Sequence, residues 1–77
     1  MDEFYIALKE VRKAYAGTRM ADDIYHVTRN FHRDFWGERL IGAGESMMKV
    51  YRLTGKEIDV TEIVAFNEIK RVVAQYA

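Results

Sequence analysis

The sequence contains no cysteine and no proline. Without cysteine the chain can form neither a disulfide framework nor a thiolate zinc site, and it suits a reducing compartment. Long apolar runs are also missing. The N-terminal stretch MDEFYIALKE has two acidic residues after Met1 and is not apolar for long enough to form a signal peptide or a membrane-spanning helix. We therefore expect a cytoplasmic protein without a membrane segment.

The chain also lacks an excess of charge of either sign. Its 12 Lys and Arg residues match its 12 Asp and Glu residues, and the two signs balance separately in segments 1–17, 18–40 and 41–77. A protein that binds nucleic acid usually carries a concentrated positive footprint, and an acidic mimic of nucleic acid carries the opposite. Both classes are therefore disfavoured.

The composition is that of a folded domain. The 77 residues are 49% hydrophobic and 31% charged, and they predict a single domain over 1–77. A domain of this size buries only about 60% of the surface that its unfolded chain exposes, so a partner subunit would add useful stability. We expect a homo-oligomer. Because the chain begins at Met1, we also expect a complete short bacterial or phage reading frame.

Apolar periodicity predicts a first helix in the stretch DEFYIALKEVRKAYAG. Phe4, Leu8, Val11 and Tyr15 recur at spacings of four, three and four, which places them on one helical face. Gly17 suits a left-handed residue that ends this helix.

A second helix is expected to begin near Met20 to Asp23 and to extend at least to Trp36. Gly37 ends or weakens it, and the stronger break is expected at GAG, residues 42–44. The apolar stripe of this helix contains Ile24, Val27, Phe31 and Phe35.

Two interpretations are open for the segment that follows. A short helix would place Met47, Val50 and Tyr51 on one face and would end at Gly55. The alternative is a hairpin around 48–61, because Lys49–Leu53 and Glu57–Thr61 both alternate between apolar and polar residues. The two adjacent methionines favour the helix.

The last helix is expected to start after Asp59, which forms a capping box with Glu62. The predicted fold is all-α, a small bundle of three to four helices, with α+β as the alternative if the hairpin forms. The predicted core consists of Phe4, Leu8, Val11, Ile24, Val27, Phe31, Phe35, Phe66, Ile69 and Val73.

Four residues of the second predicted helix lie on a face other than the core stripe. Tyr25, Arg29, His32 and Trp36 share a narrow arc about 110° away from Ile24. Tyrosine, tryptophan and arginine are the residues most enriched at interface hot spots, so one interpretation is a partner-binding surface with Trp36 as its anchor. The other is that the helix packs on two neighbours and this arc belongs to the core. The first helix adds Tyr5 and Ile6 to the candidate surface.

No pattern predicts catalysis, a metal or a cofactor. His26 and His32 are six residues apart and would face different sides of a helix, while Asp22 and His26 lack further ligands nearby. The adjacent acids Asp22 and Asp23 are typical of a helix start. The glycines at 37, 42 and 44 fit neither a dinucleotide fingerprint nor a P-loop. We do not expect an enzyme.

The sequence thus predicts a small non-enzymatic module that binds a larger protein as a regulator, adaptor or inhibitor, with a homodimer as the expected form. The alternative is a DNA-binding regulator of helix-turn-helix type, in which Thr28, Arg29, Asn30 and Arg33 would reach bases or phosphates. The salt dependence of binding distinguishes these two functions, because DNA binding weakens steeply with ionic strength.

Overall fold

A computed structural model describes residues 2–76 and contains four α-helices within that range. They are α1 (Glu3–Ala14), α2 (Arg19–Asn30), α3 (Trp36–Thr54) and α4 (Val60–Tyr76), with a 3₁₀ turn, η1 (Arg33–Phe35), before α3. No strand occurs among these described residues. The all-α bundle is confirmed, and the hairpin alternative is wrong because residues 49–54 continue α3.

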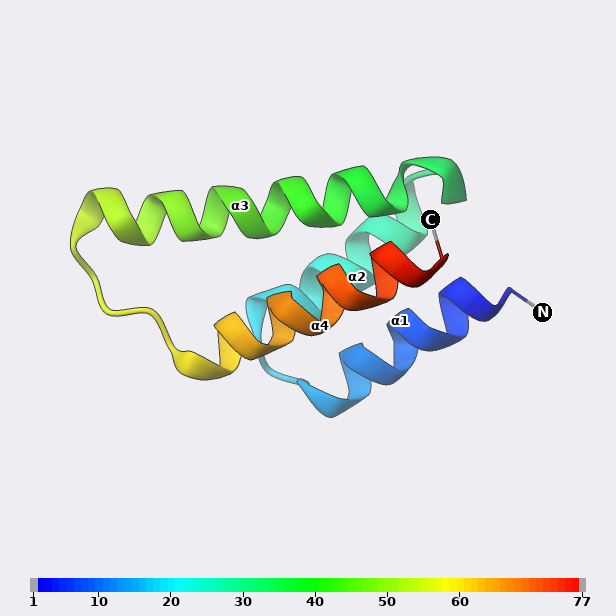
Figure 1. Ribbon diagram of the computed structural model, residues 1–77, viewed down its shortest axis with the longest axis horizontal. Coiled ribbons are helices and arrows are strands. Elements are labelled where there is room, and N and C mark those ends of the chain that lie inside the picture. The colour runs from blue at the N-terminus through cyan, green and yellow to red at the C-terminus, as the bar shows by residue number, and fades with distance from the viewer. Residues whose placement is uncertain (1, 77) are drawn as a thin grey trace.

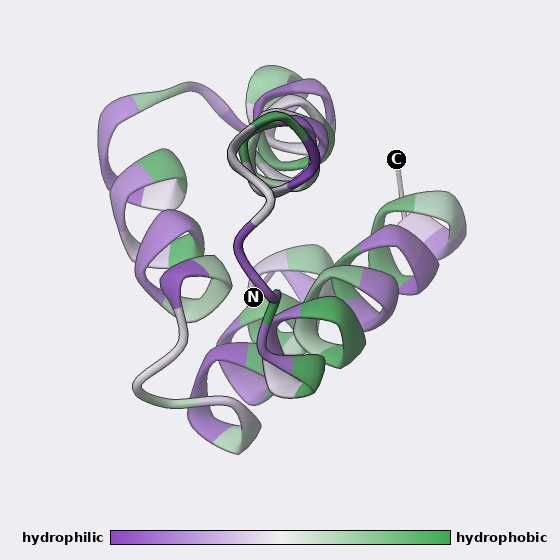
Figure 2. Cartoon of the chain, turned by 90° about the vertical axis from the view of Figure 1, so that its left-hand side faces the viewer, coloured by the Kyte–Doolittle hydropathy of each residue, from purple (hydrophilic) through white to green (hydrophobic). Residues whose placement is uncertain are grey.

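Three of the helices, α1, α2 and α4, pack on one another, and α3 lies across α2 and α4 on the side away from α1 (Figure 1). The molecule is elongated, with extents of 41 × 22 × 21 Å. Because α3 is the longest helix, it forms one long edge of the molecule. Seen nearly end-on in Figure 2, this helix has no other ribbon on its outer side.

Side chains and glycines define the helix ends. Asp2 Oδ1 accepts a hydrogen bond of 2.9 Å from the Phe4 amide at the start of α1, and Asp59 Oδ1 accepts one of 2.9 Å from the Thr61 amide at the start of α4. Gly17 and Gly55 have positive φ angles of 91° and 67°, the conformation expected after a helix end. The predicted end at Gly55 is confirmed, whereas α1 already ends at Ala14 with Tyr15 as its C-cap, so the left-handed Gly17 belongs to the turn that follows the helix.

The predicted capping box at the start of α4 is wrong in its second half. Glu62 does not reach back to Asp59. Its Oε1 accepts a hydrogen bond of 2.6 Å from the backbone amide of Arg19, in the first turn of α2. A buried carboxylate of α4 therefore satisfies an amide at the N-terminus of another helix, where negative charge is favoured.

The second helix ends six residues earlier than predicted. It stops at Asn30, and Phe31 is extended, with φ −127° and ψ 151°. The chain turns through η1 and continues as α3 from Trp36. Burial of the indole accounts for the turn: Trp36 is 8% exposed, and its Nε1 donates a hydrogen bond of 2.8 Å to the Phe31 carbonyl.

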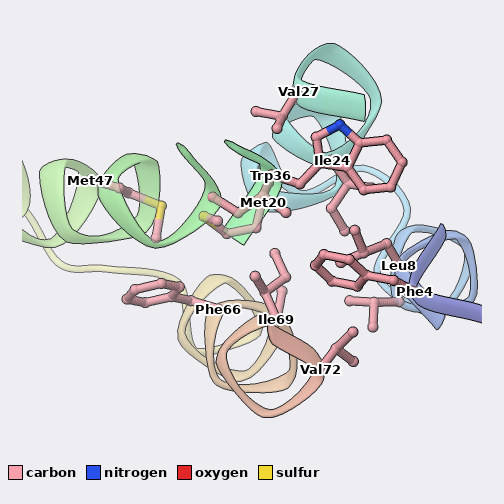
Figure 3. Packing of buried hydrophobic residues seen from close by; sticks show 13 residues of the cluster. Phe4, Leu8, Met20, Ile24, Val27, Trp36, Met47, Phe66, Ile69 and Val72 are labelled. Atoms are coloured by element: carbon pink, nitrogen blue, oxygen red, sulfur yellow. The ribbon is translucent and has the colours of Figure 1, made fainter. Parts of the chain in front are cut away.

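The predicted core needs correction at this corner. Phe31 and Phe35 are 38% and 52% exposed, because the helical phase is lost after Asn30, and Val73 is only partly buried. Figure 3 shows the observed cluster, in which Trp36 lies beside Ile24 and Phe4. The core consists of Phe4, Leu8, Val11, Met20, Ile24, Val27, Trp36, Leu40, Met47, Ala65, Phe66, Ile69 and Val72.

The predicted break at residues 42–44 is also wrong, since α3 is continuous through all its glycines. Gly44 is buried against α4, and a Cβ atom at this position would lie 2.1 Å from Cε1 of Phe66. Close packing of this ring on the α3 backbone outweighs the poor helix propensity of glycine. Val50, which was predicted to share a face with Met47 and Tyr51, is exposed, whereas Met47 is buried and Tyr51 is partly buried.

Candidate functional site

A shallow hollow of about 140 Å³ lies between α1 and α2. We call it the α1–α2 hollow. Three of its lining residues come from α1 and four from α2, and they combine tyrosine rings and cationic side chains with the buried side chain of Ile24. The lining residues are Tyr5, Lys9, Arg12, Ile24, Tyr25, Thr28 and Arg29.

Two arginines of the hollow contact Tyr25. Arg29, one turn later in α2, donates a hydrogen bond of 2.6 Å from Nη1 to the Tyr25 hydroxyl. The Arg12 guanidinium of α1 lies 4.6 Å from the centre of the Tyr25 ring, and that of Arg29 lies 5.4 Å from it. Each cation–π contact is worth about 0.5–1 kcal/mol at exposed sites, and that of Arg12 joins α1 to α2 across the hollow.

Tyr5 forms the other aromatic wall. Lys9 Nζ lies 5.3 Å from the centre of its ring, and the ring of Trp36 lies 5.9 Å away at an angle of 46°. Trp36 in turn packs on Phe4 in the core, with ring centres 5.7 Å apart. The start of α3 therefore supports the exposed tyrosine from below.

The hollow is cationic. Three of its lining residues, Lys9, Arg12 and Arg29, carry positive charge, and no acidic side chain lines it. Among residues 2–76, none of these three cations forms a salt bridge. An aromatic face attracts a cation without cancelling its charge, so the three cations can still attract an anion.

The structure brings together only part of the predicted surface. Tyr5, Tyr25 and Arg29 line the α1–α2 hollow, whereas Ile6 is exposed outside it. His32 lies in the connection between α2 and α3, and its exposed Nδ1 accepts a hydrogen bond of 3.2 Å from the Asp34 amide.

Trp36 is buried, so its predicted place as an exposed anchor is wrong, as is the shared helical arc with Tyr25. The alternative interpretation, a tryptophan packed in the core, is the correct one for this residue. Partner binding by the exposed members of the set stays a prediction.

Lys9 and Arg12 were not predicted as site residues. A signal for them exists in the sequence, because Tyr5, Lys9 and Arg12 follow one another at spacings of four and three and so share one side of α1. What the sequence does not show is that this side of α1 faces the tyrosine side of α2.

A second polar cluster lies between α2 and α4. One carboxylate oxygen each of Asp23 and Glu62 is buried without a hydrogen-bond partner. Burial raises the pKa of Asp23 above its ordinary value, and the carboxylates of Glu62 and Asp22 raise it further, while Arg19 and His26 oppose the change. Neither Asp23 nor Glu62 lines the hollow, so we assign this pair to the packing of the bundle.

Within residues 2–76, no three His, Cys, Asp or Glu side chains gather as a group that could hold a metal ion. None of the helices in this part of the chain has both the length and the apolar character needed to cross a membrane. Comparison with known proteins gives no match to a family model, a curated protein or a solved structure.

Proposed function

We propose that this protein is a small non-enzymatic interaction module, a regulator, adaptor or inhibitor that binds a larger protein through the α1–α2 hollow. The group recognised would be an acidic side chain of the partner. The observation that carries this proposal is the gathering of Lys9, Arg12 and Arg29 around two tyrosines without a carboxylate among them.

The size of the hollow supports a side chain as its ligand. Pockets for small-molecule substrates enclose about 300–1,000 Å³, whereas this hollow measures about 140 Å³. Such a space admits one carboxylate with its stem. Tyrosine and arginine are also the residues that contribute most to binding at protein interfaces.

The side chains are partly organised before a partner arrives. Arg29 is held by the Tyr25 hydroxyl, and Arg12 by the face of the same ring. Less conformational entropy is lost when groups already held in place bind a ligand, so an ordered guanidinium pair favours affinity. Two guanidinium groups can also bind one carboxylate through short charge-assisted hydrogen bonds.

DNA binding is the second candidate, because the same three cations would attract phosphates and because Arg29 and Thr28 lie in the hollow. The balance of charge along the rest of the chain supports the protein partner instead.

The proposal is tested by quantitative capture from a lysate of the source cells, with the wild-type protein and the variants Arg12→Glu and Arg29→Glu as baits. Lys56→Glu is the matched control, since Lys56 is an exposed cation in the connection between α3 and α4. We expect the wild type and the control to retain a common protein that both hollow variants lose. Equal capture by all four baits would contradict the proposal.

Nucleic acid is tested with the same four proteins by fluorescence anisotropy on a duplex of mixed sequence. If the hollow binds DNA, the wild type gives a signal that collapses between 50 and 200 mM salt, roughly the range in which phosphate contacts lose most of their affinity. That result would replace the protein partner with the second candidate.

A further inference from the structure

The outer face of α3 borders two grooves along the junction of α3 and α4. One, of about 610 Å³, includes Glu38, Ile41, Gly42 and Glu45 in its lining. The other, of about 500 Å³, includes Glu45, Met48, Lys49 and Arg52. Glu45 borders both, so the two grooves meet at the middle of α3. We call these seven residues of α3 the outer α3 face.

The two ends of this face carry opposite charge. The half before Glu45 contains Glu38, with Asp34 beside it in the same groove, and Arg33 there is already paired with Asp2. The half after Glu45 contains Lys49 and Arg52, with Lys70 of α4 beside them. None of these three cations forms a salt bridge within residues 2–76.

This arrangement is complementary to itself. When a face carries opposite charges at its two ends, a two-fold axis through its centre brings each end onto the opposite end of a second copy. With this axis, a side chain before Glu45 faces the partner's side chain that lies about as far after Glu45 and near the same line along the face. Glu38 and Arg52 are such a pair, each seven residues from Glu45.

The same symmetry matches the apolar side chains. At about 100° per residue, Gly42 and Lys49 lie on one side of the line through Glu45, at similar distances before and after it, and Ile41 and Met48 lie likewise on the other side. The axis would therefore place the partly buried Met48 over Ile41 of a second copy, and the apolar stem of Lys49 over Gly42.

Gly42 gives independent support. It lies inside a helix, where glycine costs about 1 kcal/mol relative to alanine, and a Cβ atom at this position would meet no atom within 4 Å. Unlike Gly44, it therefore has no packing role within one chain. A glycine opposite the stem of a lysine across an interface provides the space that the longer side chain needs.

We propose that the protein is a two-fold symmetric homodimer in which the outer α3 faces of two copies pack antiparallel, with the axis at Glu45. The proposal identifies a surface through which the homo-oligomer expected from the sequence would form. It does not depend on the ligand of the α1–α2 hollow, which lies on other helices. One cost is built in: the two Glu45 carboxylates approach each other at the axis.

The test is the solution mass by light scattering over a range of protein concentrations, with far-UV circular dichroism to confirm the fold. We expect the wild type to be a dimer. Glu38→Arg and Arg52→Glu should each raise the dissociation constant of the dimer about tenfold or more, because like charges then face each other twice per dimer. We expect Glu38→Arg combined with Arg52→Glu to restore dimerisation. Lys56→Glu, the control, should dimerise as the wild type does.

The rescue is decisive because Glu38 and Arg52 are about 21 Å apart along one α3 helix, too far to interact within a chain. We also expect Glu45→Gln to tighten the dimer, because it removes the repulsion at the axis. A wild type that is monomeric at every concentration would overturn the inference, as would a dimer that both charge reversals leave unchanged. Neither result bears on capture through the hollow.

Discussion

Trp36 connects the exposed aromatic surface to the core. Its indole packs on Phe4, supports Tyr5 and donates a hydrogen bond to the Phe31 carbonyl that shapes the corner between α2 and α3. In the proposed binding, Trp36 would therefore act indirectly, through the position of Tyr5.

We predict that Trp36→Ala lowers the free energy of unfolding by about 3–5 kcal/mol, the usual cost of removing a large buried aromatic. Trp36→Phe retains most of the packing and loses the hydrogen bond, at a cost of about 1 kcal/mol. Urea denaturation followed by circular dichroism measures both. An alanine variant as stable as the wild type would show that the indole is not part of the core.

Two glycines of α3 provide a matched pair. We predict that Gly44→Ala destabilises the protein by about 1–3 kcal/mol, because the new methyl group would overlap the buried ring of Phe66. Gly42→Ala should instead stabilise the folded chain by about 0.5–1 kcal/mol through helix propensity, since its Cβ meets open space. Both are measured by urea denaturation at a concentration that keeps the chain monomeric. Equal effects at the two positions would contradict the observed packing.

Asp23 links stability to pH. Because burial raises its pKa in the folded state, the protonated form fits the fold better, and the stability that this adds is present below the ordinary pKa of 3.8 and lost as pH rises through the raised value. At neutral pH the ionised Asp23 therefore destabilises the bundle.

We predict that Asp23→Asn raises the free energy of unfolding at pH 7 and that the gain shrinks as the pH falls toward 4. Urea denaturation at several pH values measures this difference, with the exposed Glu57→Gln as the control. A gain that is constant with pH would show that ionisation of Asp23 is not its cause.

At the scale of the helices, the contact between α4 and the start of α2 holds distant parts of the chain together. Glu62 accepts a hydrogen bond from the Arg19 amide, 43 residues away in sequence.

We predict that Glu62→Ala lowers the free energy of unfolding by about 1.5–3 kcal/mol, as expected for a lost hydrogen bond to a charged group. Glu62→Gln retains an acceptor and should cost less. Thermal unfolding of both variants checks this order. If Glu62→Gln proved more destabilising than Glu62→Ala, Glu62 would not act as a cap of α2.

Some helices could be predicted closely because their signals are local. In α1, the burial of Phe4, Leu8 and Val11 follows from their spacing alone. The left-handed turn at Gly17 follows from the freedom of glycine to adopt positive φ. Periodicity failed at the end of α2, where neither proline nor glycine follows Asn30 and the apolar spacing continues through Phe31 and Phe35. The turn there depends on the burial of Trp36, which is a tertiary contact.

The continuity of α3 was unpredictable for the same reason. A glycine between two helical stretches indicates a break unless another helix packs against it, and here the ring of Phe66 comes from 22 residues further along the chain. The candidate site followed this pattern as well. Tyr5, Tyr25 and Arg29 could be selected from residue type and spacing, whereas Lys9 and Arg12 join them only through the packing of α1 on α2.

At the scale of the whole molecule, two exposed surfaces serve different partners in this account. All the charged side chains that line the α1–α2 hollow are cations, which suits an acidic group. The outer α3 face has an acidic and a basic half, which suits a second copy. Because α3 lies on the side of the bundle away from α1, a dimer formed through α3 would leave both hollows open (Figure 1). Such a dimer would bind two acidic groups and gain from bivalent attachment.

Binding of an acidic side chain in the hollow is tested by titrating isotope-labelled protein with hexaglutamate peptide and recording amide proton–nitrogen correlation spectra. We expect the amide signals of Lys9, Arg12, Tyr25 and Arg29 to move with a common affinity and Arg29→Glu to abolish their movement. Movement of amide signals only at the other basic cluster, Lys49, Arg52 and Lys70, would contradict binding in the hollow, as would the absence of any movement.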